Sequence, residues 1–370
     1  MTEPLRLLDE HGQNVWVDDL SRAMVRSGEL ATLIDRGITG VTSNPTIFHT
    51  AITEGNAYDD RLAEELRRQR DPKEIYLSLV AEDIRDACDL LRPNFDHDGA
   101  GLRGWVSLEV DPRLADDSVA TVEEAKRLHA LIDRPNLFVK IPGTLAGLAA
   151  IENTVALGIP VNVTLLFSVD RHRAAARAYQ RGLCKLRAAG GDPVSTPSVA
   201  SFFVSRVDSA ADRRLEEREG PAELRSTLAI ANAKLAYQNY LDHLDEAEWQ
   251  DLAAAGAQPQ RCLWASTSVK DPALRDVSYV EALVGPDTIT TMSRPTIEAF
   301  GDHGTVDPSL RDGLEDARRT LERFAEAGVD YQELTTALER DGVHRFTDSF
   351  IGLLEAIAEK RDHFAEGGAR

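Results

Sequence analysis

Cysteine is scarce in this chain. The 370 residues include three cysteines, Cys88, Cys184 and Cys262, which lie far apart and form no CxxC pair. An odd number at such spacing argues against a disulfide framework and against a cysteine-based zinc site. The cysteines therefore favour a reducing compartment, and we expect a cytoplasmic protein.

Positive charge is also in short supply. Lysine and arginine total 42 against 62 aspartates and glutamates, which gives a formal net charge of −20 at pH 7. Such a surface repels phosphate backbones and anionic lipids on average, so we expect neither nucleic-acid nor membrane binding. No apolar run approaches the length of a membrane span, and the N-terminal sequence has no basic leader. Any bound phosphate must meet a local concentration of cations.

Two functional motifs are missing as well. No GxGxxG turn follows the first candidate strand, which weakens a dinucleotide-binding interpretation. No close pair of histidines stands at a strand end, which disfavours a metal-dependent barrel.

Short apolar runs rich in β-branched residues alternate with longer segments of helical periodicity. This alternation is typical of a parallel sheet wrapped by helices. The candidate strands are 14–18, 40–43, 105–110, 137–141, 161–166, 199–204, 262–267 and 288–292. Eight strand–helix units in a chain of this length favour a closed α/β fold, the (β/α)8 TIM barrel, over an open doubly wound sheet.

The chain shows no convincing interdomain linker. Gly- and Pro-rich connectors at 92–104, 188–198 and 253–260 are too short for that role. Helical periodicity from about residue 311 onward predicts an extension, 311–370, that packs on the barrel. We therefore expect one barrel domain over residues 1–370, with additional helices at its N- and C-terminal ends.

One lysine lies inside a candidate buried strand. In the stretch NLFVKIPGT, strand alternation puts Phe138 and Lys140 on the same face. If that face is a closed interior, burial disfavours the charged ammonium, and the free amine can attack a carbonyl and form a Schiff base. The alternative is a gatekeeper lysine on a sheet edge, which does no chemistry.

Polar side chains recur at the carboxyl ends of the other candidate strands. Side chains that carry out chemistry in a barrel of this kind lie at those ends and face inward. In chain order they are Asp18, Asn44, Glu109, Asn162, Thr164, Ser201, Arg206, Ser266 and Lys270.

Each of these residues has a purely structural alternative. A helix cap would explain Asp18, a turn before proline would explain Asn44, and an ion pair with Lys140 would explain Glu109. Hydrogen bonds within a buried sheet would account for Asn162 and Thr164. Arg206 and Lys270 could be ordinary surface cations. These alternatives explain the joint recurrence poorly, so the residues predict an enzyme with a lysine–carboxylate site in a barrel.

Several longer stretches carry a family resemblance. They are GVTSNPTIF from Gly40, VSLEVDP from Val106, FVKIPGT from Phe138, GIPVNVTLLFS from Gly158, SFFVSR from Ser201, and the later WASTSVKDP and YVEALVGPDTITTMSRPT. Together they cover most of the chain, and in them the sequence resembles the transaldolases. The resemblance implies a (β/α)8 barrel with a Schiff-base lysine on the fourth strand and no metal or organic cofactor. It also implies the non-oxidative pentose phosphate pathway, in which a dihydroxyacetone unit moves from a ketose phosphate to an aldose phosphate.

The resemblance also implies catalytic roles. Lys140 resembles the family nucleophile that attacks the ketose carbonyl. Glu109 and Thr164 resemble the pair that handles a catalytic water. Asp18 resembles the carboxylate that takes the proton from the hydroxyl next to the breaking carbon–carbon bond.

Substrate contacts follow from the same resemblance. The residues that match the family's binding positions are Asn44, Asn162, Ser201, Arg206, Ser266 and Lys270. The last of these departs from the family pattern, which has an arginine soon after the position of Ser266. This chain reads Thr267, Ser268 and Val269 there, so we assign the second phosphate-binding cation to Lys270.

We therefore expect a transaldolase that acts as a monomer or homodimer. Its expected ketoses are sedoheptulose 7-phosphate and fructose 6-phosphate, and its expected aldoses are glyceraldehyde 3-phosphate and erythrose 4-phosphate. Two alternatives remain: a Schiff-base aldolase that releases free dihydroxyacetone, and a sugar-phosphate-binding barrel without catalysis.

Overall fold

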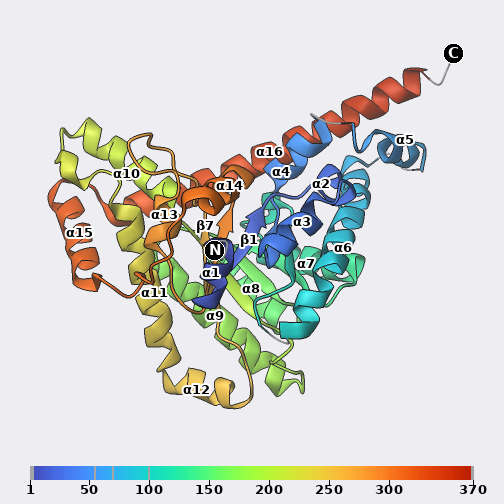
Figure 1. Ribbon diagram of the computed structural model, residues 1–370. Helices are drawn as coiled ribbons and strands as arrows, with labels where there is room; N and C mark the ends of the chain where they lie inside the picture. The colour runs from blue at the N-terminus through green and yellow to red at the C-terminus, as the bar shows by residue number, and fades with distance from the viewer. Residues whose placement is uncertain (1–3, 54–55, 69–70, 99–100, 368–370) are drawn as a thin grey trace.

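Eight parallel strands close into a barrel in their order along the chain (Figure 1). The computed structural model describes residues 4–53, 56–68, 71–98 and 101–367. The strands are β1 (Gln13–Asp18), β2 (Gly40–Thr42), β3 (Trp105–Glu109), β4 (Leu137–Pro142), β5 (Val161–Leu166), β6 (Ser198–Phe203), β7 (Arg261–Ala265) and β8 (Thr288–Met292). Pairing of β1 with β8 completes the ring. The predicted (β/α)8 barrel is confirmed, and every predicted strand boundary lies within two residues of the observed one.

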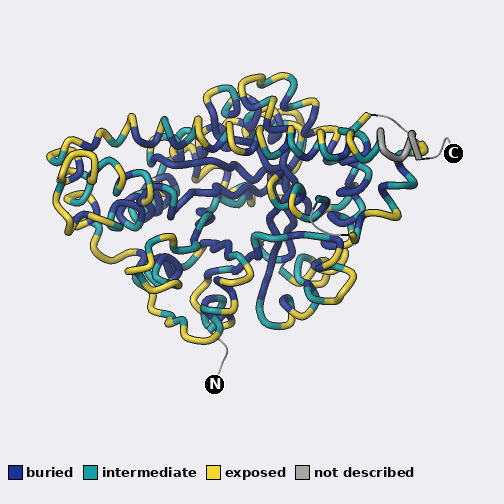
Figure 2. The backbone as a smooth tube through the Cα atoms, turned by 90° about the horizontal axis from the view of Figure 1, so that it is seen from above, coloured by how far each residue is buried: buried dark blue, intermediate teal, exposed yellow. Residues whose placement is uncertain are grey.

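Helices surround the barrel and extend it at both ends. They are α1 (Pro4–Glu10), α2 (Arg22–Arg26), α3 (Glu29–Arg36), α4 (Pro45–Thr53), α5 (Asp59–Arg68), α6 (Pro72–Asp98), α7 (Ser118–Ile132), α8 (Leu145–Val155), α9 (Val169–Ala188), α10 (Ser205–Glu217), α11 (Leu228–Leu244), α12 (Ala247–Ala254), α13 (Ser278–Ala282), α14 (Arg294–His303), α15 (Leu314–Glu326) and α16 (Tyr331–Gly367), with 3-10 turns η1 (Pro112–Leu114) and η2 (Ala222–Leu224). Buried residues concentrate along the strands and exposed ones on the outer helices (Figure 2). Within the described residues, no helix is both long and apolar enough to cross a membrane.

The connector predicted at 92–104 is partly wrong, because α6 continues through Pro93 to Asp98. Packing explains the difference. Phe95, in the last turns of α6, meets the ring of Trp105 edge-on at a centroid distance of 5.1 Å. This tertiary contact outweighs the helix-breaking preference of proline. Residues 99–100 of that connector lie outside the described residues.

Aromatic rings fill the barrel interior away from the carboxyl ends of the strands. Trp105 stacks on Phe138 at 4.1 Å, and Trp16 lies 6.1 Å from the same ring. Gly40 makes room for them, since a Cβ atom there would stand 2.5 Å from the Trp16 indole nitrogen. The indole N–H of Trp16 donates to the carbonyl of Leu102, and that of Trp105 donates to the carbonyl of Gly101. Both buried donors therefore have a partner. The barrel is a packed core with its polar side chains gathered at one end.

Strand β5 is irregular near its end. Its register with β6 shifts between Val163 and Leu166, and Leu165 has a φ of 60°, in the left-handed region. The Leu165 side chain lies against α16, where a Cβ atom on Gly342 would stand 2.9 Å from its Cδ2 atom. A bulge of this kind re-aims side chains at the rim of a barrel. The simple alternation of the sequence did not predict it.

The C-terminal helices confirm the additional helices expected there. Helix α15 packs on α11, and α16 crosses the carboxyl ends of the strands, where it contacts α4, α6, α10, η1 and β5 (Figure 1). Residues 368–370 of the expected extension 311–370 lie outside the described part. Because α16 lies over the end of the barrel that holds the polar side chains, it forms one wall of whatever site exists there.

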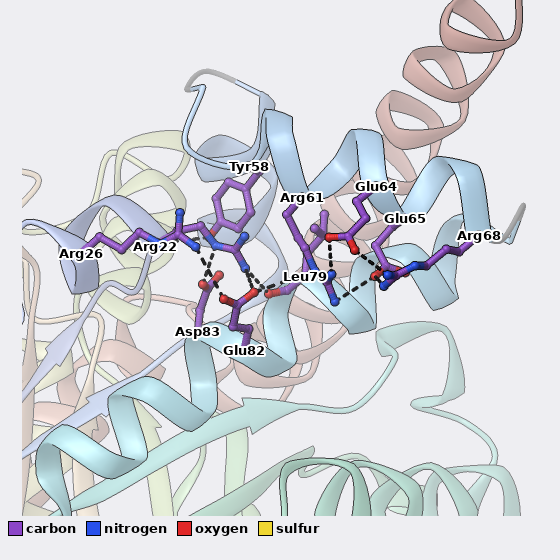
Figure 3. A network of polar contacts seen from close by, with 10 residues as sticks. All are labelled: Arg22, Arg26, Tyr58, Arg61, Glu64, Glu65, Arg68, Leu79, Glu82 and Asp83. Carbon is purple, nitrogen blue, oxygen red and sulfur yellow. Dashed lines mark hydrogen bonds and ion pairs between the residues drawn. The ribbon is translucent and has the colours of Figure 1, made fainter. Parts of the chain in front are cut away.

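A buried arginine fixes the connection after β1 (Figure 3). The Arg22 side chain, 1% exposed, donates from Nε to Asp83 Oδ1 at 2.8 Å and from Nη2 to Glu82 Oε2 at 2.9 Å. Its guanidinium also lies over the Tyr58 ring, 4.8 Å from the centroid. The network ties α2 to α6, and α2 begins four residues after Asp18.

Candidate active site

The side chain of Lys140 projects from β4 into the polar end of the barrel. The residue is 4% exposed, and its Nζ atom donates to the carbonyl of Ser43 at 3.2 Å. The same nitrogen lies 3.4 Å from Glu109 Oε2. A closed barrel has no edge strand, so the gatekeeper alternative for Lys140 is wrong.

Glu109 stands beside Lys140 because strands β3 and β4 pair them directly in register. Its carboxyl is buried, and apart from the ion pair neither oxygen has a hydrogen-bond partner among the described residues. Burial raises the pKa of Glu109 to about 7, although the nearby Lys140 opposes the shift. The carboxyl therefore titrates where a general acid or base is most useful near neutral pH.

A cavity of about 160 Å³ opens at this end of the barrel. Eight of the ten predicted site residues line it: Asp18, Asn44, Lys140, Thr164, Ser201, Arg206, Ser266 and Lys270. The remaining two contact residues of this lining, Glu109 through Lys140 and Asn162 through Ser201. The structure thus brings together predicted residues from seven strands or the turns that follow them, as expected at the carboxyl face of such a barrel.

Asn162 supports the site from below. It is fully buried, donates from Nδ2 to Ser107 Oγ at 3.0 Å and accepts from Ser201 Oγ at 2.7 Å. This is the hydrogen bonding within the sheet that the structural alternative proposed. It also orients the Ser201 hydroxyl, which lines the cavity.

Asn44 has two functions in the structure. Its Oδ1 atom accepts from the backbone N–H groups of Thr46 and Ile47 at 3.0 and 3.1 Å, so it caps the first turn of α4. The turn-forming alternative is therefore correct for the side-chain oxygen. The residue also lines the cavity, which leaves its amide nitrogen as the group that a ligand can meet.

Asp18 ends β1 and borders the cavity. The helix-cap alternative is wrong for it, since Ser21 caps α2 by accepting from Met24 N at 3.2 Å. Protein packed around the carboxyl raises the pKa of Asp18, and the positive charges of Lys140 and Arg206 oppose the rise. Asp18 therefore lies within electrostatic range of both cations of the cavity.

The Thr164 hydroxyl is completely buried at the cavity wall. It has no hydrogen-bond partner among the described residues. A buried hydroxyl without a partner is costly, so such groups are expected to meet a ligand or water.

Two further cations, Arg206 and Lys270, line the cavity. Arg206 lies in the first turn of α10, its guanidinium 5.2 Å from the Phe203 ring, and its Nη1 atom is buried without a hydrogen-bond partner in the described part of the chain. Ser266 lines the cavity beside it and shares a 3.0 Å contact with the Ser205 hydroxyl. Lys270 also borders the cavity, but it is an exposed side chain.

Sequence reasoning missed part of the cavity wall. The missed residues are Thr42, Phe203, Leu263, Ala265, Ser268, Thr291 and Phe346. Strand alternation in SFFVSR places Phe203 on the same face as Ser201, so that signal was available. No local signal marks Phe346, whose position depends on the path of α16 across the barrel.

The described residues include no group of three or more histidine, cysteine, aspartate or glutamate side chains placed to hold a metal ion.

Comparisons with known proteins converge on one family. The family model described as transaldolase/fructose-6-phosphate aldolase matches residues 15–357. A protein of Parafrankia sp. named transaldolase is 50% identical over 364 residues, which cover 97% of this chain and 98% of that protein. Proteins of the same name from Acidothermus cellulolyticus and Thermobifida fusca are 48% and 47% identical, and the matches cover 96% and 97% of this chain and 96% and 99% of theirs.

Proposed function

Because the chain belongs to the transaldolase and fructose-6-phosphate aldolase family, we propose that it is a transaldolase whose covalent intermediate forms on Lys140. The observation that carries the proposal is the buried Lys140 amine, 3.4 Å from a carboxyl that titrates near pH 7, in a polar cavity that an arginine also lines. A binding protein without catalysis would not need this pair.

Schiff-base formation is the first step. The neutral Lys140 nitrogen attacks the ketose carbonyl to give a carbinolamine, which loses water to become an iminium. Glu109 lies within reach of the nitrogen and can give a proton to the departing hydroxyl and later take one from the water that hydrolyses the product. The Thr164 hydroxyl is the neighbouring group that would hold that water.

Carbon–carbon cleavage follows. Asp18 takes the proton from the hydroxyl on the carbon that will become the aldehyde, and the electrons of the broken bond pass to the iminium. The aldose phosphate leaves, and an enamine of dihydroxyacetone stays on Lys140. The raised pKa of Asp18 suits a group that accepts this proton and returns it when the acceptor aldehyde is joined.

Neutral donors hold the three-carbon fragment between the two half-reactions. The Asn44 amide and the Ser201 hydroxyl, the latter oriented by Asn162, face the cavity without supplying a strong acid. Such preorganised dipoles retain the fragment and do not protonate its enamine.

The phosphate end rests mainly on Arg206. Its planar fork suits a phosphate, and its buried, unpartnered Nη1 atom is a donor ready for one. Ser266 adds a hydroxyl at the same end, and Lys270 adds a positive charge from the rim. We propose sedoheptulose 7-phosphate and fructose 6-phosphate as ketoses, and glyceraldehyde 3-phosphate and erythrose 4-phosphate as acceptors, in a cytoplasmic enzyme built as one barrel domain.

A two-arm assay tests the function. The purified protein is incubated with fructose 6-phosphate, with and without erythrose 4-phosphate, and sedoheptulose 7-phosphate and free dihydroxyacetone are measured. A transaldolase forms the heptulose with the acceptor and little dihydroxyacetone without it. Stoichiometric dihydroxyacetone without an acceptor would instead identify a Schiff-base aldolase, and no turnover in either arm would identify a binding protein.

A further inference from the structure

The Phe346 ring lies close to two of the cations that line the cavity. It lies on α16, is 4% exposed and lines the cavity. The centroid of its ring is 5.9 Å from Lys140 Nζ and 6.0 Å from the guanidinium carbon of Arg206. One aromatic ring therefore faces both the nucleophile and the phosphate end.

Helix α16 is fixed on both sides of this ring. On the N-terminal side, Tyr331 Oη donates to Asn232 Oδ1 at 2.6 Å, and Glu339 pairs with Arg171 at 3.0 Å. On the C-terminal side, Phe350 packs edge-on against Tyr76, with the ring centroids 5.4 Å apart. Contacts on both sides of the ring hold the helix over the barrel, so Phe346 is a fixed part of the wall.

Among the described residues, the one by which α16 lines the cavity is thus apolar, whereas most lining side chains from the strands and the turns after them are polar. Neutral donors on the strands bind the hydroxyls of the three-carbon fragment, and the ring offers no proton and no site for water. A closed apolar wall lowers the concentration of water beside a reactive intermediate.

The enamine has two fates, which differ in whether its nucleophilic carbon meets the acceptor aldehyde or a proton. In transfer, its nucleophilic carbon bonds to the acceptor aldehyde, the acceptor oxygen gains a proton, and the product iminium adds one water to free the heptulose and the Lys140 amine. In release, that carbon takes a proton instead, and the resulting iminium adds one water, loses dihydroxyacetone and returns the free Lys140 amine. Release consumes one water in total and involves no oxidation or reduction.

We propose that Phe346 is a specificity-determining residue that favours transfer over release by keeping proton-donating water from the nucleophilic carbon of the Lys140 enamine. The proposal rests on the transaldolase function proposed above. It assigns this task to a residue of the C-terminal extension, outside the eight strands and the turns that follow them.

Replacement of Phe346 tests the proposal, with Phe350 as the matched control. Phe350 is the same residue type, one turn later on α16 and 2% exposed, but it does not line the cavity. Phe346→Ala, Phe346→Leu and Phe350→Leu are compared by the ratio of dihydroxyacetone released to heptulose formed from fructose 6-phosphate and erythrose 4-phosphate. We expect this ratio to rise about tenfold in Phe346→Ala, to rise about twofold in Phe346→Leu, which keeps an apolar group, and to stay unchanged in Phe350→Leu.

Borohydride trapping with fructose 6-phosphate accompanies each assay, because a Lys140 adduct shows that a variant is folded and reactive. An unchanged ratio in a trapped Phe346→Ala protein would overturn the proposal, and so would an equal rise in Phe350→Leu. If Phe346→Ala forms no Lys140 adduct, the product ratio of Phe346→Leu decides instead. If the unaltered protein itself forms no Lys140 adduct, the proposed function fails, which is a different result.

Discussion

The Nζ atom of Lys140 lies 3.4 Å from a carboxyl oxygen of Glu109, its register partner on the neighbouring strand. Both side chains are almost completely buried at the carboxyl end of the barrel. Burial raises the pKa of Glu109 to about 7, so its carboxyl can both give and take a proton near neutral pH. This arrangement is what a carbonyl-attacking amine and its proton carrier require.

Glu109→Gln should remove one ionisation from the dependence of kcat on pH. The pKa of Glu109 is raised to about 7, so kcat in the unaltered protein should depend on an ionisation near that pH. We expect the variant to lose about 10²–10⁴-fold in kcat and to show no such ionisation. The profile is measured from pH 5 to pH 9 by heptulose formation. A near-neutral ionisation that persists in the variant would assign it to another group.

The same variant tests the stability linkage of Glu109. The folded carboxyl, with its pKa near 7, holds its proton more tightly than the unfolded one, whose ordinary value is 4.5. Stability from this group is therefore fully present below about pH 4.5 and is lost as the pH rises to about 7. We measure the free energy of unfolding in urea at pH 5 and at pH 8. It should fall more between these two pH values in the unaltered protein than in Glu109→Gln, because all other groups titrate in both proteins. An equal loss would contradict the buried placement of this carboxyl.

Arg206 and Lys270 should differ in their effect on phosphate binding. Arg206→Met removes a partly buried fork, and we expect KM for fructose 6-phosphate to rise about 10–100-fold. Lys270→Met removes an exposed charge, for which about a threefold rise is expected. Steady-state kinetics with fructose 6-phosphate and with unphosphorylated fructose separate the phosphate contribution. Equal effects of the two variants would show that Lys270 fully replaces the second arginine of the family.

Arg22→Met should destabilise the protein strongly. Its removal leaves the buried Asp83 carboxylate without its partner, and breaking such a pair costs about 3–5 kcal/mol. The exposed pair Lys126–Glu123 is the control, because loss of a surface ion pair by Lys126→Met costs under about 1 kcal/mol. Urea unfolding gives both values. A cost below that of the control would mean that the network adds nothing to stability.

Gly40→Ala should overpack the barrel interior. The added Cβ atom would stand 2.5 Å from the Trp16 indole, and such crowding costs about 1–3 kcal/mol. Gly352→Ala is the matched control on α16, where the nearest atom would be 3.7 Å away, and we expect it to be neutral or to stabilise by up to about 1 kcal/mol. Thermal unfolding distinguishes them. Equal melting temperatures would show that the Trp16 ring moves freely.

The strands were predictable because burial in a parallel sheet imposes continuous β-branched and apolar runs. Strands β5 and β8 match their predicted bounds, and the inward alternation around Lys140 holds. The gathering of the predicted polar residues at one cavity was predictable as well, because the carboxyl ends of parallel strands meet at one end of the barrel. Asn44 shows the limit of such a prediction. The sequence offered a structural and a binding interpretation as alternatives, whereas its side-chain oxygen caps α4 and the same residue also lines the cavity.

What could not be predicted depends on contacts distant in sequence. Helix α6 passes through Pro93 because Phe95 packs on Trp105, and local preferences carry no trace of that contact. The bulge at Leu165 fits a glycine of α16, and Phe346 enters the cavity only because α16 crosses the barrel. These features arise from tertiary packing, which overrides local propensity.

The central claim is that one buried amine bonds covalently to the substrate ketone, and chemical trapping measures this directly. The protein is reduced with borohydride in the presence of fructose 6-phosphate, digested and mapped by mass spectrometry. The account predicts a reduced three-carbon adduct on the peptide that contains Lys140, and none in a folded Lys140→Ala variant. An adduct on another lysine, or turnover by Lys140→Ala at the unaltered rate, would contradict it.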